Sequence, residues 1–164
     1  MFEYKTGLGI DVHQLQPQFP LVLGGITIDF DFGLAGHSDG DVLVHAIIDG
    51  ILGAMTFGDI GSMFPSEDTS LKGIRSMEML KQVEKARQTT NWQVTHVDAT
   101  IIAQKPRLSD YIIDMKRSID SILNIGIDSI NLKATTTDHL GFIGDGLGIA
   151  AIAVVTIKKQ HETI

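Results

Sequence analysis

Three side chains in the first third of the sequence have the chemistry of a metal site. Asp11 and His13 stand two positions apart within a predicted strand, so both side chains project from the same face. His45 interrupts an otherwise apolar helical stretch, residues 42–48. One carboxylate and two imidazoles form a three-ligand set with an open fourth position, as a catalytic zinc requires. The alternative is that His45 is a core histidine bonded to a backbone carbonyl.

Asp49 lies one helical turn after His45. At this spacing two side chains reach the same side of a helix, and we expect the Asp49 carboxylate to orient the imidazole by accepting its hydrogen bond. The alternative is that Asp49 pairs with a nearby cation.

The residues before this helix suit a phosphorylated ligand. His37 and Ser38 precede the first turn, whose N–H groups are free to bind phosphate oxygens. Asp39 and Asp41 beside them oppose an anion unless a metal intervenes. A plain helix cap, formed by Ser38 or Asp39, is therefore the alternative.

A second polar segment follows a later strand. The hydroxyls of Thr135, Thr136 and Thr137 suit phosphate oxygens, and Asp138 could hold a hard cation such as Mg²⁺. The alternative is structural, because threonine is common in strands. Neither the glycines near the N-terminus nor those at 141–148 match a dinucleotide-binding pattern.

Alternating strands and helices must position these side chains. Hydrophobic spacing predicts strands at 4–12, 21–30, 93–103, 130–136 and 149–158, helices at 41–57, 74–88 and 108–123, and loops at 58–71 and 138–148. This order predicts an α/β protein with α+β layering, in which helices cover one face of a mixed sheet. The last strand is apolar on both faces, so we expect a second copy of the chain to cover the other face.

Composition sets the limits on function. The chain has 164 residues, a net charge of −7 and no cysteine, which predicts one domain over 1–164 and excludes a disulfide scaffold and thiolate-ligated metals. Thirteen basic against twenty acidic residues give no footprint for nucleic acid. The apolar stretch 147–157 is about half of the ~20 residues that a membrane helix needs. We therefore expect a cytoplasmic protein with neither nucleic acid nor a membrane as partner.

Taken together, five ordered segments resemble the 2-C-methyl-D-erythritol 2,4-cyclodiphosphate synthases of the non-mevalonate isoprenoid pathway. The segments are residues 9–13, 35–46, 57–61 with 64–65, 103–106, and 133–142. The resemblance implies a homotrimer with sheets packed around a central axis and active sites between subunits. It also implies that the 2-phosphate of 4-diphosphocytidyl-2-C-methyl-D-erythritol 2-phosphate attacks the β-phosphorus and releases cytidine monophosphate. The enzyme would be a phosphorus–oxygen lyase.

The resemblance also implies roles for individual residues. One Zn²⁺ per chain would bind Asp11, His13 and His45, and Asp138 would hold Mg²⁺ or Mn²⁺ on the substrate diphosphate. His37 and Thr136 would stabilise the transition state. The cytosine pocket would come from the adjacent subunit. The substrate contacts implied are Asp11, Val12, His13, His37, Ser38, Asp59, Ile60, Gly61, Phe64, Pro65, Ser66, Glu67, Asp68, Lys72, Ala103, Gln104, Lys105, Pro106, Arg107, Leu108, Ser109, Thr135, Thr136, Thr137, Asp138 and Phe142.

Three positions depart from the family pattern. Asp138 stands where many relatives have Glu, and the loop residues Asp145 and Leu147 stand where many have Arg and Glu. A carboxylate in place of a cation reverses the local field, so we expect no prenyl diphosphate in the central cavity of the trimer. Two other functions are open from the residues alone: a metal-dependent phosphohydrolase, and a non-catalytic trimeric binding protein.

Overall fold

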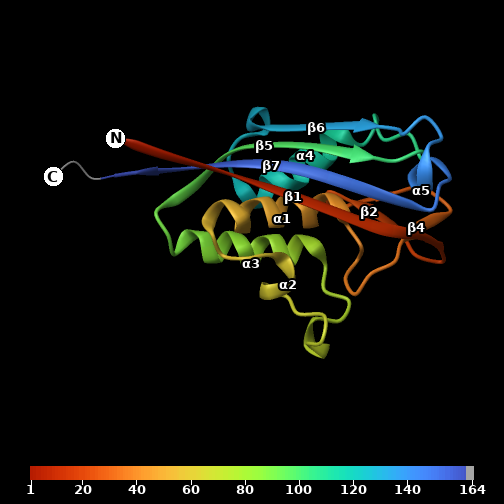
Figure 1. The fold of residues 1–164 in the computed structure, drawn as a ribbon, viewed down its shortest axis with the longest axis horizontal. Helices are drawn as coiled ribbons and strands as arrows, with labels where there is room; N and C mark the ends of the chain where they lie inside the picture. The colour runs from red at the N-terminus through yellow and green to blue at the C-terminus, as the bar shows by residue number, and fades with distance from the viewer. Residues whose placement is uncertain (162–164) are drawn as a thin grey trace.

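The computed structural model describes residues 1–161 as a mixed β-sheet with helices packed on one face (Figure 1). The strands are β1 (Phe2–Pro17), β2 (Leu21–Leu23), β3 (Ile26–Ile28), β4 (Phe32–Leu34), β5 (Trp92–Ile102), β6 (Ile130–Thr135) and β7 (Gly148–Gln160). The helices are α1 (Val42–Met55), α2 (Ile60–Met63), α3 (Ser76–Gln88), α4 (Ile112–Leu123) and α5 (Gly141–Gly144), with single 3₁₀ turns at Thr69–Leu71 and Ile127–Ser129.

The main sheet has the order β4-β1-β7-β5-β6. Strand β7 pairs antiparallel with both β1 and β5, and only the β5–β6 pair is parallel. The expected α/β fold with a mixed sheet is confirmed. Among the described residues, no helix is long and apolar enough to cross a membrane.

Helix α1 packs directly against the centre of the sheet. It is buried along almost its whole length, since β1 and β7 lie on one side of it and α3 on the other. The backbones of β1 and α1 approach closely: a Cβ on Gly9 would lie 1.9 Å from the Ala46 carbonyl oxygen, and one on Gly7 would lie 2.0 Å from that of Gly50. Only glycine allows this contact.

Residues alternate along β1 between the helix side and an open face. Leu8, Ile10 and Val12 are exposed on the face opposite α1, whereas the odd-numbered residues face the helix. Val154 of the neighbouring strand β7 is also partly exposed. The alternation places Asp11 and His13 together on the α1 side.

Several boundaries differ from those expected. The predicted strand at 21–30 is a hairpin, β2 and β3, because Gly24 and Gly25 adopt positive φ and form its turn. The predicted loops at 58–71 and 138–148 contain the short helices α2 and α5, and strand β4 was not expected. These elements have three or four residues each, too few to produce a periodic pattern.

The N-cap of α1 also differs from the expectation of Ser38 or Asp39. Asp41 is the cap, with its Oδ1 accepting from Val44 N at 3.1 Å and its Oδ2 accepting from Gly25 N at 2.7 Å. The buried carboxylate thus fixes the β2–β3 turn to the start of α1. The side chain of Asp39 is instead bonded to Ser76 at the start of α3.

Candidate metal centre

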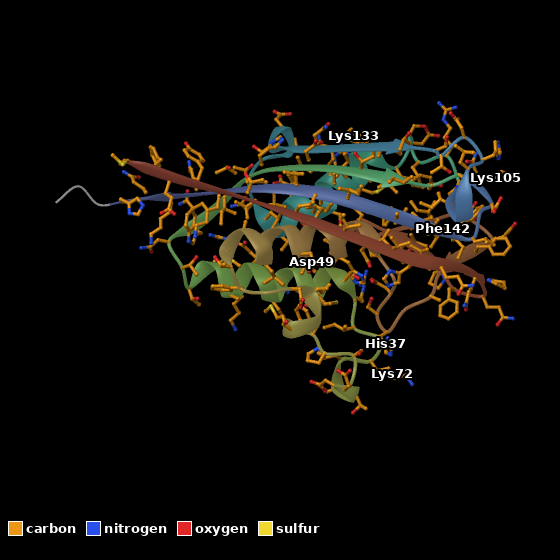
Figure 2. All side chains as sticks on the ribbon, in the orientation of Figure 1. His37, Asp49, Lys72, Lys105, Lys133 and Phe142 are labelled. Carbon is orange, nitrogen blue, oxygen red and sulfur yellow. The ribbon has the colours of Figure 1, made fainter. Side chains whose placement is uncertain are left out.

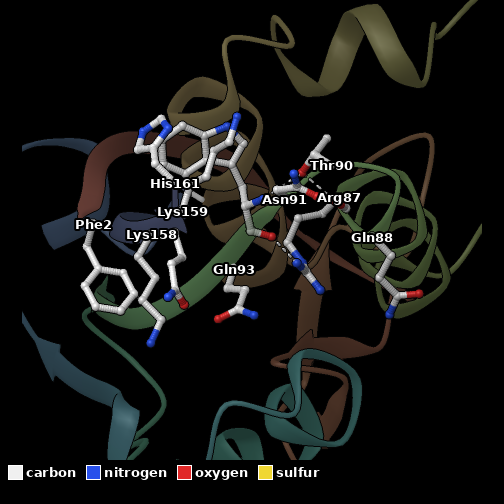
Figure 3. A pocket seen from close by; sticks show the side chains of 11 residues that line it. Phe2, Arg87, Gln88, Thr90, Asn91, Gln93, Lys158, Lys159 and His161 are labelled. Atoms are coloured by element: carbon white, nitrogen blue, oxygen red, sulfur yellow. Dashed lines mark hydrogen bonds between the residues drawn. The ribbon is translucent and has the colours of Figure 1, made fainter. Parts of the chain in front are cut away.

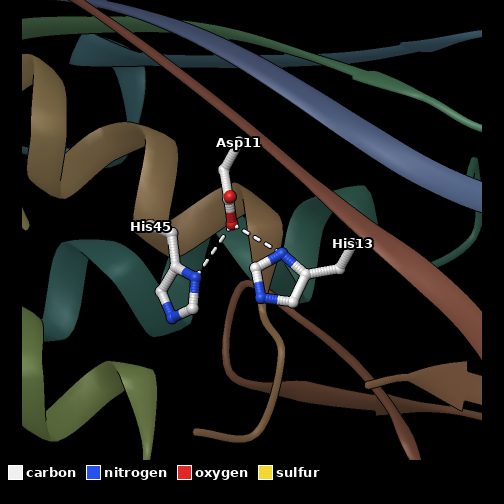
Figure 4. Close-up of side chains that lie close together, drawn as sticks. All are labelled: Asp11, His13 and His45. Atoms are coloured by element: carbon white, nitrogen blue, oxygen red, sulfur yellow. Dashed lines mark hydrogen bonds and ion pairs between the residues drawn. The ribbon is translucent and has the colours of Figure 1, made fainter. Parts of the chain in front are cut away.

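Asp11, His13 and His45 converge between β1 and α1 (Figure 4). The Asp11 Oδ2 atom lies 2.9 Å from His45 Nδ1 and 3.0 Å from His13 Nδ1. One candidate ligand atom from each residue falls within 4.8 Å of the other two. The strand alternation and the first turns of α1 therefore bring together the three side chains that the sequence predicted.

Charge and burial act in opposite directions on Asp11. Burial raises the pKa of its carboxyl, but the neighbouring imidazoles of His13 and His45 outweigh burial and hold the pKa well below its usual range. Asp11 is therefore ionised at neutral pH, the form in which a carboxylate binds a metal.

The three residues fit a divalent metal. His13 Nδ1 is buried and, although it lies 3.0 Å from Asp11 Oδ2, it is not in hydrogen-bond geometry with that atom or with any other residue within 1–161. A buried polar atom without a partner is costly, and a cation would satisfy it. Ligand atoms about 3 Å apart can share one ion, because zinc binds nitrogen and oxygen at about 2.0–2.2 Å.

A cavity of about 440 Å³ opens in front of these ligands. His37 and Lys72 line it, from the segments that project below the sheet (Figure 2). The expected substrate contacts among its lining residues are Asp11, His13, His37, Ser38, Ile60, Gly61, Phe64, Pro65, Ser66, Asp68 and Lys72. The structure also adds Thr69, Leu71, Ile74 and Met79 to this wall.

Three expected contacts from the first half of the chain lie outside this wall. Val12 is 46% exposed on the opposite face of the sheet, because adjacent strand residues point to opposite sides. The Asp59 carboxylate caps α2 by accepting from Ser62 N and Ser62 Oγ, both at 2.7 Å. Glu67 is exposed and accepts from Ser66 Oγ at 3.3 Å.

A second cavity, of about 630 Å³, lies at the carboxyl ends of β5 and β6. Figure 2 shows Lys105 well apart from His37 and Lys72. The expected contacts that line it are Ala103, Gln104, Lys105, Pro106, Arg107, Leu108, Ser109, Thr135 and Thr136. The two cavities have no lining residue in common, so a single chain separates the two groups of expected contacts.

The turn after β6 carries the remaining expected residues. Asp138 N donates to Thr136 Oγ1 at 3.2 Å, Thr137 Oγ1 donates to Leu140 O at 2.8 Å, and Phe142 lies exposed on α5. The Asp138 carboxylate is exposed, with Thr136 Oγ1 at 3.4 Å from its Oδ1. This leaves most of the carboxylate free to bind a cation.

Asp49 has a different partner from the one expected. Its Oδ1 accepts from the backbone N–H of Ile60 at 2.7 Å, and burial raises the pKa of its carboxyl. The carboxylate therefore anchors the start of α2, which lies beside α1. The carboxylate of Asp49 binds the backbone amide of Ile60, which has no partner within α2 because it lies in the first turn, and not the imidazole of His45 as its i+4 spacing had suggested.

Ser76 was not predicted from the sequence as a contact of the site. Its Oγ lies 2.9 Å from His45 Nε2, on the side of the ring opposite Asp11. The available signal was weak: a serine at the start of a predicted helix is typical of a cap, whatever lies nearby.

A further cavity, of about 960 Å³, lies away from these ligands, at the end of the sheet where Phe2 and His161 line one pocket (Figure 3). Among its cations, Arg87 is already engaged, because it donates to the Trp92 carbonyl and forms an ion pair with Glu84 at 2.6 Å. The residues described there include no metal-ligand group.

A family model described as the YgbB family matches residues 4–158. The chain is 48% identical over 155 residues to the 2-C-methyl-D-erythritol 2,4-cyclodiphosphate synthase of Desulforamulus reducens, with 94% of this chain and 99% of that protein covered. The bifunctional IspDF from Campylobacter jejuni is 41% identical with a TM-score of 0.93, covering 98% of this chain but only 43% of that longer one. A CDP complex of IspF from Plasmodium falciparum is 30% identical, with a TM-score of 0.85 and coverage of 96% and 97%.

Proposed function

The chain belongs to the YgbB family. On this basis we propose which of its residues carry out the reaction of a 2-C-methyl-D-erythritol 2,4-cyclodiphosphate synthase. The activity is that of a lyase of the non-mevalonate isoprenoid pathway. Its substrate, 4-diphosphocytidyl-2-C-methyl-D-erythritol 2-phosphate, closes to the cyclic diphosphate and releases cytidine monophosphate. The roles proposed for individual residues rest mainly on one observation: the Asp11–His13–His45 cluster lines a cavity.

The reaction needs positioning more than it needs a protein nucleophile. The attacking 2-phosphate and the β-phosphorus belong to the same molecule, so the chain must hold them in line. Correct placement of reacting groups is worth up to about 7–11 kcal/mol. Charge on the transferring phosphoryl group must also be neutralised.

We propose that Asp11, His13 and His45 hold one Zn²⁺ and that Asp138 holds Mg²⁺ or Mn²⁺. These ions, when bound, would neutralise and polarise the phosphate oxygens of the substrate. The unsatisfied His13 Nδ1 and the absence of thiolates in the sequence support an oxygen and nitrogen site.

The other cavity residues would bind and orient the substrate. His37, Ser38 and Lys72 supply donors to the phosphates at the mouth of the first cavity. Ile60 and Gly61 would contact the ribose together with Asp59. Residues 103–109 would enclose the cytosine in the second cavity, and Thr136 would stabilise the transition state. Cytidine binding would then help to place the distant diphosphate.

We further propose a homotrimer in which each active site lies between two copies of the chain. The separation of the two cavities in one chain supports this arrangement, as do the exposed apolar residues Leu8, Ile10 and Val12. We also propose that residues 1–164 form one domain, which the match over 4–158 supports. The cytoplasmic location stays a prediction.

The activity is tested by ³¹P NMR of the purified protein with its cytidine diphosphate substrate, zinc and magnesium. We expect cytidine monophosphate and a cyclic diphosphate. A linear phosphate product would instead assign the site to a phosphohydrolase, and the absence of any product would contradict both functions.

The metal centre is tested by elemental analysis of the purified protein. We expect close to one zinc per chain in the wild type and almost none in His45→Ala, because two ligands hold zinc much more weakly than three. His96→Ala is the control, since His96 lies outside the cluster. Equal zinc contents in wild type and His45→Ala would contradict the assignment.

A further inference from the structure

Both ring nitrogens of His45 lie within hydrogen-bond distance of a polar side chain. Its Nδ1 faces Asp11 at 2.9 Å, and its Nε2 faces Ser76 Oγ, also at 2.9 Å. His45 is 7% exposed and Ser76 is completely buried, so water does not compete for this second contact. Ser76 is the first residue of α3, far from α1 in sequence.

Asp39 determines which way the Ser76 hydroxyl points. Its carboxylate accepts the backbone N–H of Ser76, at 3.2 Å from each oxygen, and it also accepts the Ser76 hydroxyl. An ionised carboxylate has no proton to donate, so the hydroxyl hydrogen goes to Asp39. The Ser76 oxygen then presents its lone pairs to His45.

This orientation determines the tautomer of His45. An oxygen that presents a lone pair requires a hydrogen on the facing nitrogen, so Nε2 carries the proton. Ser38 Oγ, 3.1 Å from the same nitrogen, accepts from Gly40 N at 3.1 Å and is a second oxygen on this side. With the proton on Nε2, the Nδ1 lone pair would be available to a metal ion bound between His45 and Asp11.

We propose that Ser76, oriented by Asp39, is a positioning residue that fixes the ring and the tautomer of His45 for metal binding. The proposal rests on the proposed function, because it assigns His45 as a ligand. Partners on the far nitrogen of a ligand histidine orient the ring and increase its basicity, and their loss typically weakens metal binding by about 10–100-fold. Among the described residues, this contact takes the place that we expected Asp49 to fill.

The first test is zinc affinity, measured by competition with a chromophoric chelator. We expect Ser76→Ala to bind zinc about 10–100-fold more weakly than the wild type. Asp39→Asn should weaken binding in the same direction, because an amide can donate to Ser76 and turn its hydroxyl toward His45. Val83→Ala is the matched control: Val83 is buried in the same helix but belongs neither to the ligand cluster nor to the cavity wall, so this variant should loosen α3 and leave zinc affinity unchanged.

The second test observes the ring proton of His45 directly. In NMR spectra of the zinc-loaded protein, we expect the Nε2 proton of His45 to exchange slowly with water in the wild type and in Val83→Ala, and clearly faster in Ser76→Ala, because its buried acceptor is gone. A helix cap with no effect on His45 would leave this exchange rate unchanged.

Failure of this proposal differs from failure of the proposed function. Wild-type zinc affinity in Ser76→Ala, or an equal loss in Val83→Ala, would overturn the positioning role and leave the metal centre intact. A wild type that binds no zinc would instead overturn the metal centre, and the positioning role would fall with it.

Discussion

At the scale of single residues, the pKa values of the Asp11 and Asp41 carboxyls are shifted in opposite directions by their surroundings. Asp11 is flanked by two imidazoles, and the pKa of its carboxyl lies well below the usual range despite burial. Asp41 is completely buried and accepts backbone N–H groups, among them those of Gly25 and Val44, and burial raises its pKa to about 6. The negative charge of Asp39 nearby raises it further.

The raised pKa of Asp41 predicts a stability change between pH 4 and 7. Because folding raises this pKa from 3.8 to about 6, the protonated carboxyl stabilises the folded protein below about pH 4, and this contribution is lost as the pH rises through 6. Asp41→Asn cannot titrate. The difference in free energy of unfolding between the wild type and Asp41→Asn should therefore fall by on the order of 3 kcal/mol from pH 4 to pH 7.

Denaturant unfolding of both proteins at pH 4 and pH 7 measures this difference. The comparison cancels the titration of all other groups, because both proteins share them. A difference that is the same at the two pH values would show that Asp41 does not titrate there.

At the scale of elements, the site depends on the distance between β1 and α1. His45 lies on α1 and both Asp11 and His13 lie on β1, so the separation of their backbones sets the separation of the ligand atoms. Gly7 and Gly9 allow the strand to touch the helix. Any side chain at Gly9 would collide with the Ala46 carbonyl, which lies one residue from His45.

We therefore expect Gly9→Ala to destabilise the protein and to weaken its metal binding. The added Cβ would lie 1.9 Å from Ala46 O, and forcing backbones apart in a packed interior costs about 1–3 kcal/mol or more. The free energy of unfolding and the zinc content both measure the effect.

Gly53→Ala is the matched control for this substitution. Gly53 also lies on α1, but it is exposed and a Cβ there meets no atom within 4 Å. Alanine favours a helix over glycine by about 0.5–1 kcal/mol, so this variant should be slightly more stable. Equal stabilities of Gly9→Ala and Gly53→Ala would contradict the role of the close contact.

At the scale of the whole molecule, a trimer would account both for the two separate cavities and for the exposed apolar face of the sheet. The chain presents half of the proposed site near α1 and the other half at the ends of β5 and β6. Apolar residues on β1 are exposed between them on the face without helices. A trimer would cover this face and join the cavities of neighbouring copies.

Mixing two inactive variants tests the shared site. His45→Ala removes a ligand near α1, and Ala134→Trp fills the second cavity from an exposed position. Each variant alone should be inactive. Coexpressed in equal amounts, they should recover about one quarter of wild-type activity, because random trimers place two intact halves together in that fraction of sites.

Coexpression with two different affinity tags isolates the mixed oligomers for the assay. No recovery in verified mixed oligomers would mean that each site is built within one chain, and a protein that elutes as a monomer would contradict the trimer.

Much of this arrangement is predictable from local pattern. The apolar stretch of α1, the alternation along β1 and the two-residue spacing of Asp11 and His13 each follow from the periodicity of one element. The chemistry of the three ligands follows from their side-chain types. Short elements such as β4 and α2 do not produce such a pattern and were missed.

The sequence by itself determined the layered α/β fold, the family and the three residues that form the candidate metal site, because these depend on residue type and local spacing. Only the tertiary structure decided which partners the polar side chains have. Asp49 binds the amide of Ile60, and Asp41 caps α1. Ser76 at the start of α3 contacts His45 on α1. A hydrogen bond joins whichever donor and acceptor packing brings within about 3 Å, and that proximity is not encoded in the spacing of either residue along its own element.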